Sequence, residues 1–292
     1  MFVEIFAVLA PVLFCALAGF IWAKSSHEYP SEFISKLVFN LAAPCLVVSS
    51  ISSVQLSVEA LTEMALAATL ALVIILLLGY GLLKVLGHDV PTVLVSLAFP
   101  NVGNMGLPLA FFAFGDEGLA LAVAYFMVIS IAHFTIGMAI ATGQGISWRH
   151  FLLNPILGAI LLSCLLVFTQ SHLPLWLANS VTLIGQVTIP LMLMTLGVSL
   201  AQIKFQQWSQ GFLYSVLRLL LGGGVACLVV ELLDIEGVAR SVVILQGLMP
   251  VAVFNYLFAL KSQRNVETVA SMVMISTLLA MLILPAVLYA LM

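Results

Sequence analysis

Two clusters of proline, glycine and amide residues lie inside otherwise apolar segments, where they could bind a polar solute. The clusters fall in the stretches SLAFPNVGNMGLPLAFFAFG at 96–115 and VVILQGLMPVAVFNYLFALK at 242–261. Their members are Pro100, Asn101, Gly103, Asn104, Gly106 and Pro108 in the first stretch, and Gln246, Gly247, Pro250 and Asn255 in the second. Proline removes a helix hydrogen bond and glycine is a poor helix former. We therefore expect both segments to be broken helices.

A broken helix in an apolar segment offers the chemistry of an anion site. The N-terminal end of a half-helix presents free N–H groups and the positive end of the helix dipole. The side chains of Asn101, Asn104, Asn255 and Gln246 can donate hydrogen bonds without adding a fixed charge. Because uncharged donors bind an anion weakly enough to release it, we expect a small carboxylate at these breaks.

Other polar residues inside apolar segments have two interpretations each. Arg218 could contribute charge to anion binding, or it could form a structural pair with backbone carbonyls or an acidic side chain. His133 could couple transport to protons, or it could be a core histidine bonded to a backbone carbonyl. Asn40 and Gln186 could line a cavity or form hydrogen bonds across helices.

The composition shows where these residues must lie. The chain has 292 residues, of which 63% are hydrophobic and 7% charged, whereas a soluble domain has about 25% charged residues. This excludes a soluble globular protein, a disordered chain and a nucleic-acid binder, and it predicts an all-α polytopic membrane protein. Ten apolar segments can be drawn, at roughly 3–23, 33–53, 61–86, 91–113, 117–141, 150–168, 177–199, 209–232, 237–260 and 267–291.

The basic residues are distributed unevenly between the two sides of the predicted membrane. The connections after the odd-numbered segments, with the adjoining segment ends, hold Lys24, Lys36, Lys84, Arg149, Lys204, Lys261 and Arg264. The opposite side has Arg240 alone. Cytoplasmic loops carry an excess of lysine and arginine, so we expect both termini to lie outside the cytoplasm.

Two pairs of similar stretches suggest an internal repeat. Residues 40–44 and 186–190 both read amide-x-x-x-Pro, and residues 126–130 and 272–276 both end in Ile-Ser. Each pair is separated by 146 residues. Because five segments per half is an odd number, the two halves, 1–142 and 143–292, would form an inverted repeat, as in many secondary transporters.

Motifs for other classes of activity are missing from the sequence. It contains no HExxH, no pair of aspartates within an apolar segment and no phosphate-binding GxxxxGK[ST]. We therefore predict no enzyme activity, no cofactor and no metal site. Sodium coupling would need carboxylate or carbonyl oxygens near the breaks, and no Asp or Glu lies centrally in any segment, so proton coupling is favoured over sodium.

The broken segments resemble those of the auxin efflux carrier family, which includes the plant PIN-formed transporters. FPNVGNMGLPL is similar to the family's fourth-span crossover, and MPVAVFNYLFA is similar to its ninth. Pro44 and the stretch IPLMLMTLGVSL at 189–200 also resemble its second and seventh spans. The similarity runs along essentially the whole chain. The chain lacks the long cytoplasmic loop of the plant members, and it has Phe254-Asn255 where they have a different order, so auxin is a doubtful substrate.

The resemblance implies a fold like that of bile acid:sodium symporters. Segments 1, 2, 6 and 7 would form a scaffold, and segments 3–5 and 8–10 a moving transport domain with crossed helices 4 and 9. It further implies an elevator-type mechanism, a homodimer in a bacterial inner membrane, and carboxylates such as malate or malonate. Asn101 would face the substrate, and Pro100 and Pro250 would shape the crossing. An anion channel and a membrane sensor of the same fold are the alternatives.

Overall fold

The computed structural model describes residues 2–25, 27–54, 57–87, 90–143, 155–203 and 207–292. These residues form helices and contain no strand. In chain order the helices are α1 (Phe2–Lys24), α2 (Ser31–Leu37), η1 (Val38–Ala42), α3 (Ala43–Val54), α4 (Val58–Val85), α5 (Val90–Ala98), η2 (Val102–Gly106), α6 (Leu107–Ala132), η3 (His133–Gly137), α7 (Met138–Thr142), α9 (Pro155–Phe168), α10 (Leu175–Gln186), α11 (Thr188–Gln202), α12 (Trp208–Leu232), α13 (Gly237–Gly247), α14 (Val253–Ser262) and α15 (Val266–Leu291). The elements labelled η are wider π-helical turns.

Seven helical segments in the described part of the chain are long and apolar enough to cross a bilayer. The chain is therefore an integral, all-helical membrane protein, as its composition predicted. The longest of the seven, Val102–Thr142, has 41 residues, about twice the length that a span needs. Gly115 divides it, because its φ of 65° is not helical. This break lies between the predicted segments 91–113 and 117–141.

Short helices, together with the long segment Val102–Thr142, account for the difference between these seven segments and the ten drawn from the sequence. Helices α5, α13 and α14 have 9, 11 and 10 residues, and α9 is a shorter apolar helix. None of them alone meets the length of about 20 residues that a bilayer core requires. Three of these helices, α5, α13 and α14, flank the clusters of proline and glycine that predicted broken helices.

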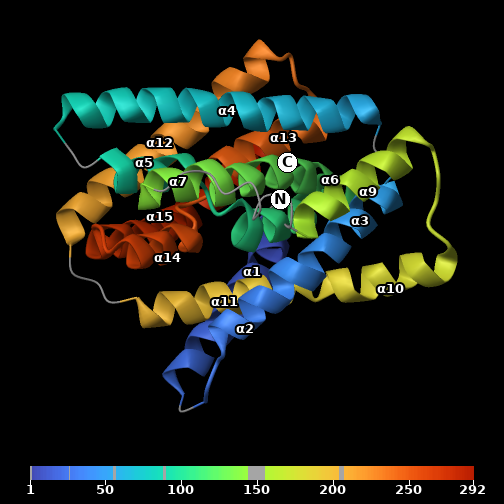
Figure 1. Ribbon diagram of the computed structural model, residues 1–292, viewed down its shortest axis with the longest axis horizontal. Helices are drawn as coiled ribbons and strands as arrows, with labels where there is room; N and C mark the ends of the chain where they lie inside the picture. Colours follow the sequence, from blue (N-terminus) through green and yellow to red (C-terminus); the bar gives the residue numbers. More distant parts are fainter. Residues whose placement is uncertain (1, 26, 55–56, 88–89, 144–154, 204–206) are drawn as a thin grey trace.

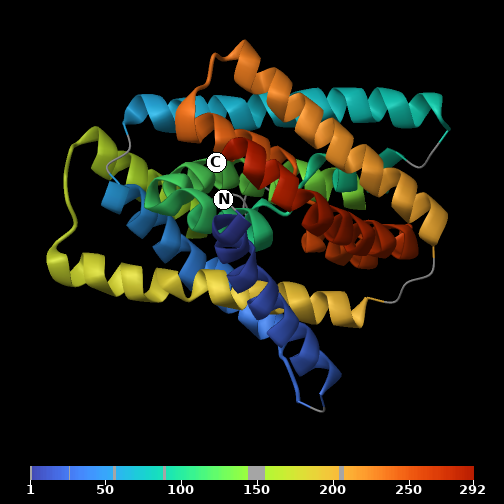
Figure 2. The same ribbon diagram turned by 180° about the vertical axis from the view of Figure 1, so that it is seen from behind.

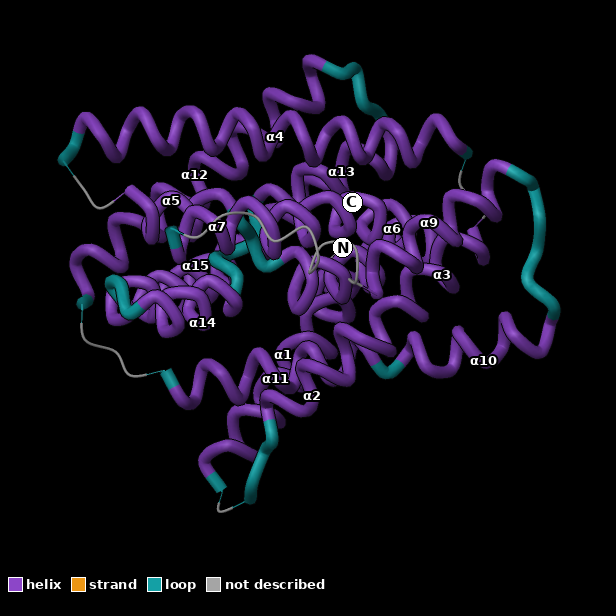
Figure 3. Tube along the Cα trace, viewed as in Figure 1, coloured by secondary structure: helices purple, strands orange, loops and turns teal. Residues whose placement is uncertain are grey.

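The helices pack in two groups. In the first group α1 packs against α11, and α3 packs against α9 and α10. In the second group α4 packs against α5 and α6, and α12 packs against α13 and α15. Figure 3 shows α1, α2, α10 and α11 along one side of the molecule and α4, α12 and α13 along the other. The groups meet where α3 and α1 contact α6, and where α11 contacts η2.

Two glycines allow α1 and α11 to cross in close contact (Figure 2). A Cβ atom on Gly19 would lie 2.1 Å from the carbonyl oxygen of Met194, and one on Gly197 would lie 1.8 Å from that of Ala16. Real Cβ atoms do not approach this closely, so any side chain at either position would separate the helices.

Helix ends alternate between two sides of the molecule. At the left of Figure 1, helices α4 and α11 end and helices α5 and α12 begin. At the right, helices α3 and α9 end and helices α4 and α10 begin. Lys84 lies in the last turn of α4, on the side that the charge bias predicts to be cytoplasmic. Arg149 and Lys204, which contribute to that bias, lie outside the described residues.

Candidate functional site

The two broken helices meet at their unwound residues. Pro100, just after α5, forms an isolated antiparallel bridge with Val251, just after α13. The N–H of Asn101 donates to the carbonyl of Pro250 at 2.7 Å. Proline has no N–H of its own to satisfy, so Pro100 and Pro250 leave fewer buried donors unpaired at the point where both helices are interrupted. The crossing therefore satisfies much of its own freed backbone, as a membrane interior requires.

Arg218, on α12, joins the C-terminal ends of the two half-helices. Its side chain is fully buried, with Nη1 donating to the carbonyl of Leu97 at 2.9 Å and Nη2 to that of Gly247 at 3.0 Å. These carbonyls belong to the last turns of α5 and α13, where a helix carries partial negative charge. Gly222 leaves the space for this contact, since a Cβ there would lie 2.2 Å from the Gly247 oxygen. The contacts favour the structural interpretation of Arg218.

Asn255 is a second support for the crossing. Its side-chain Nδ2 donates to the carbonyl of Phe99 at 3.0 Å, and its Oδ1 lies 2.6 Å from Nε2 of His133. Because Oδ1 can only accept, Nε2 carries the proton of this bond. The His133 ring is stacked on Phe99, with ring centroids 4.5 Å apart. We had expected a backbone carbonyl as the structural partner of His133, but the break in the ninth segment places an amide side chain there.

The side chain of Asn101 lacks a partner at the crossing. It is 4% exposed, and its Nδ2 has no hydrogen-bond partner among the described residues. It borders a cavity of about 30 Å³, which Asn104, Ser130 and His133 also line. That volume holds about two water molecules, which is too little for a carboxylate of several carbons. An unpaired buried donor costs about 1–3 kcal/mol, so a partner in this cavity would be stabilising.

Gln246 is buried at the crossing but apart from this cavity. It is fully buried, and neither polar atom of its side chain has a partner in the described part of the chain. It packs against Gly106, where a Cβ would lie 2.1 Å from the Gln246 Oε1. Gln246 is not among the residues that line the crossing cavity. The structure thus brings Gln246 to the crossing without exposing its amide to the cavity beside Asn101.

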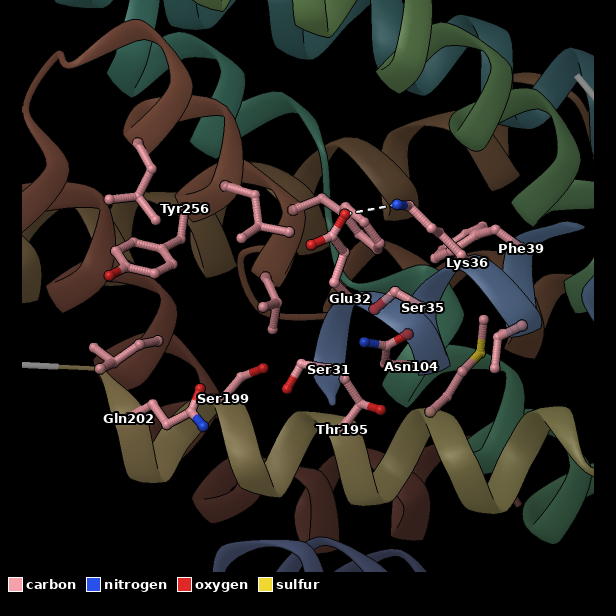
Figure 4. Close-up of a pocket in the computed structure, with 17 residues that line it drawn as sticks. Ser31, Glu32, Ser35, Lys36, Phe39, Asn104, Thr195, Ser199, Gln202 and Tyr256 are labelled. Carbon is pink, nitrogen blue, oxygen red and sulfur yellow. Dashed lines mark hydrogen bonds and ion pairs between the residues drawn. The ribbon is translucent and has the colours of Figure 1, made fainter. Parts of the chain in front are cut away.

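A cavity of about 640 Å³ lies between the two groups of helices (Figure 4). Figure 4 shows Thr195, Ser199 and Gln202 in a row along α11, with Tyr256 of α14 across the cavity. Asn104 lines both this cavity and the small one at the crossing. The large cavity is therefore the space from which a solute of several carbons could approach the crossing.

Charged residues at the large cavity are paired with each other. The Nζ atom of Lys36 lies 2.6 Å from a carboxylate oxygen of Glu32, one helical turn earlier in α2. Both side chains are largely exposed, so water and salt screen the pair and it adds little to stability. The lysine is therefore available to an approaching anion at small cost.

Thr195 is held in place by two hydrogen bonds. Its Oγ1 donates to the carbonyl of Leu191 at 2.7 Å and lies 2.8 Å from the hydroxyl of Tyr29. Burial raises the pKa of the Tyr29 hydroxyl above its usual value, whereas the bond to Thr195 acts in the opposite direction. Tyr29 therefore remains protonated at neutral pH and donates this bond. The tyrosine fixes one polar side chain of the cavity wall.

A second cavity, of about 510 Å³, lies between the same two groups of helices, at other residues. It is lined by residues of α3, α6, α10 and α11, and includes Gln186 and Asp116. Asn40, which the predicted repeat pairs with Gln186, is exposed and lines neither this cavity nor the large one. The structure therefore places Gln186 at a cavity and leaves Asn40 away from both cavities.

Pro108 and Gly103 shape the N-terminal half of the segment that follows the break. Pro108 lies in the first turn of α6, directly after η2, and its missing N–H removes one helical hydrogen bond there. A Cβ on Gly103 would lie 3.0 Å from the ring of Phe126. Gly103 therefore allows the π-helical turn η2 to pack closely on the next helix.

Phenylalanines that line the crossing cavity were not predicted as site residues from the sequence. Phe39, Phe134 and Phe254 all line the crossing cavity, but aromatic residues in apolar helices have the same sequence pattern as ordinary core residues. The departure noted at Phe254-Asn255 was a signal for one of them. Ser276 was also missed as a site residue, and its Oγ accepts a hydrogen bond from the N–H of Val251 at 3.0 Å.

Together these features define a polytopic membrane protein in which two interrupted helices cross between cavities. The model of the membrane transport protein family matches residues 4–146 and 142–288 of this chain. The chain therefore belongs to that family, which includes the auxin efflux carriers, and the resemblance drawn from its motifs is confirmed. The two matched ranges overlap at residues 142–146.

Two archaeal relatives extend the comparison. An uncharacterized transporter of Methanocaldococcus jannaschii is 24% identical over 296 residues, covering 95% of this chain and 96% of its own. An uncharacterized transporter of Methanothermobacter thermautotrophicus is 27% identical over 273 residues and covers 88% of each chain. The family is one of membrane transporters and not of enzymes.

Proposed function

We propose that the protein is a secondary transporter of small organic anions, with the carboxylate bound at the crossing of the broken helices. The observation that carries this proposal is the unpaired Nδ2 of Asn101, buried in a cavity at the crossing. Helices η2 and α14 begin at Val102 and Val253, directly after the unwound residues. Their first N–H groups have no intrahelical partners and favour negative charge.

The asparagines have different roles in this proposal. Asn101 binds the carboxylate, and Asn104 receives it, since Asn104 lines both the large cavity and the crossing cavity. Asn255 holds the crossing, because both ends of its amide are already bonded within the protein. Gln246 supports the same region from the side of α13.

An elevator-type mechanism fits the way the helices are grouped. The scaffold would comprise α1, α2, η1, α3, α9, α10 and α11, and the transport domain the remaining helices. In this proposal the chain crosses the membrane ten times as two inverted repeats of five spans. The cavities of about 640 and 510 Å³ both lie between scaffold and transport helices. Sliding of one group past the other would open the crossing to each side in turn.

We extend the proposal to coupling and assembly. His133 borders the crossing cavity, which supports proton coupling in preference to sodium coupling. We also propose a homodimer built on the scaffold, in the inner membrane of a bacterium, with both termini outside the cytoplasm.

Uptake into proteoliposomes tests the proposed substrate class. Radiolabelled malonate, malate and monocarboxylates would be supplied with and without a pH gradient and with and without sodium. We expect saturable uptake of at least one acid, lost in Asn101→Ala. Asn179→Ala, which alters an exposed asparagine on α10, is the matched control and should transport normally. Uptake of cations or neutral solutes alone would refute the proposal.

Electrical recording separates a transporter from an anion channel. A channel would give unitary currents far larger than any transporter turnover allows, whereas the proposed mechanism gives saturable flux without such currents. Unitary anion currents in planar bilayers would therefore favour the channel.

A further inference from the structure

Three phenylalanine rings pack against one another beside the crossing. The ring centroids of Phe39 and Phe254 are 4.9 Å apart, those of Phe134 and Phe254 are 5.4 Å apart, and those of Phe39 and Phe134 are 5.7 Å apart. The interplanar angles of 82°, 72° and 73° are those of edge-to-face pairs, which is a favourable arrangement for aromatic rings. We call these three residues the phenylalanine cluster.

The phenylalanine cluster lies between the large cavity and the small one. All three rings line the crossing cavity that contains Asn101, and Phe39 and Phe254 also line the cavity of about 640 Å³. A solute in the large cavity can therefore contact Phe39 and Phe254, which also border the small cavity beside Asn101. The small cavity, at about 30 Å³, has room only for water while the rings remain in contact.

The members of the cluster come from the two groups of helices. Phe39 belongs to η1, between α2 and α3, whereas Phe134 belongs to η3 and Phe254 to α14. A displacement that separates the two groups would therefore move Phe39 away from the other two rings. The pair between Phe134 and Phe254 would remain intact, because both lie in the second group.

We propose that the phenylalanine cluster is a gate that controls access from the large cavity to Asn101, with Phe39 as its movable part. Closed, it presents only apolar surface, and a charged solute that crossed it would lose its hydration without compensation. The gate therefore excludes small hydrated inorganic ions from the crossing and admits a solute only when Phe39 separates from Phe134 and Phe254. The proposal rests on the crossing being the anion site of a transporter.

Thiol accessibility tests the gate without a transport measurement. Ser130 lines the small cavity and is 6% exposed, so Ser130→Cys is a nearly isosteric reporter there. The background has Cys15, Cys45, Cys164 and Cys227 replaced by alanine. An anionic methanethiosulfonate reagent would be applied from the side of the large cavity, and the rate of modification measured.

Phe39→Ala should accelerate the modification. It removes two of the three ring pairs, and pairs of this strength shift an opening equilibrium by roughly ten- to hundredfold in total. Phe33→Ala is the matched control, because Phe33 lies in the neighbouring helix α2, is 63% exposed and is not in the cluster. It should leave the rate unchanged. Phe39→Leu, which keeps most of the side-chain volume, provides the same comparison if Phe39→Ala does not fold.

An equal rate in the Phe39 variant and its control, with both proteins folded, would overturn the gate. Carboxylate uptake is measured separately in proteoliposomes. A faster modification rate without uptake of any carboxylate would leave the gate in place and refute the proposed substrate class. If uptake is lost in Asn101→Ala but Phe39→Ala leaves the modification rate unchanged, the proposed substrate class is supported and the gate is refuted.

Discussion

Replacing Arg218 by methionine tests what holds the crossing together. Methionine is an unbranched side chain that can occupy much of the same buried space on α12, but it cannot donate hydrogen bonds. The change would leave the carbonyls of Leu97 and Gly247, now bonded to Arg218 at 2.9 and 3.0 Å, without that donor. We expect the two half-helices α5 and α13 to lose their common anchor.

The size of the effect follows from these two bonds. A buried carbonyl that loses its donor costs about 1–3 kcal/mol, so two of them cost about 2–6 kcal/mol. Relief of the desolvation of a buried guanidinium offsets part of this cost. At about 2–4 °C per kcal/mol for a large domain, a net loss of about 2 kcal/mol would lower the melting temperature by roughly 4–8 °C.

Thermal unfolding of the purified protein in detergent measures this change. Arg240→Met is the matched control, because Arg240 forms an exposed ion pair with Glu231 at 2.7 Å, which is worth about 0–1 kcal/mol. If Arg218→Met melts at the temperature of the unaltered protein, Arg218 does not stabilise the crossing. If it also loses carboxylate transport, the charge acts on the anion instead.

Two further changes probe the packing and the unwound backbone. Gly197→Ala places a Cβ 1.8 Å from a carbonyl oxygen of α1 and should destabilise the protein by about 1–3 kcal/mol or more. Gly81→Ala is the control, because nothing lies within 4 Å of a Cβ there, and it should be neutral or slightly stabilising. The melting temperatures of the two variants would show whether they differ. Ser276→Ala removes the acceptor for the N–H of Val251 and should lower the free energy of unfolding by about 1–3 kcal/mol. Ser180→Ala, at an exposed serine, should lower it by less. Equal melting temperatures of these two variants would contradict the role given to Ser276.

The interruptions of the helices could be predicted because their causes are local. Pro100 and Pro250 prevent a continuous helix wherever they lie in space. Gly115 separates two helices that apolar composition alone would have joined, and it lies between the predicted segments 91–113 and 117–141. Local rules of backbone geometry were therefore enough to locate the two interruptions along the chain.

The partners at the site could not be predicted, because they are distant in the sequence. Arg218 bonds to a carbonyl 121 residues away, and His133 bonds to an amide 122 residues away. Periodicity does not specify which face of one helix meets another in an environment where every face is apolar. For the same reason the sequence could not show that Gln186 lines a cavity while Asn40 does not.

The hydrogen bonds of the crossing also constrain how the protein can be made. The carbonyls of Leu97 and Phe99 are in the first half of the chain, and their donors, Arg218, Ala252 and Asn255, are in the second. When the first half has been synthesised and inserted, these buried acceptors have no partner from the second half. Until the second half is inserted, the unwound residues of the first half therefore need water or lipid headgroups as hydrogen-bond partners. Folding of the crossing is thus a late event, which synthesis of the ninth segment completes.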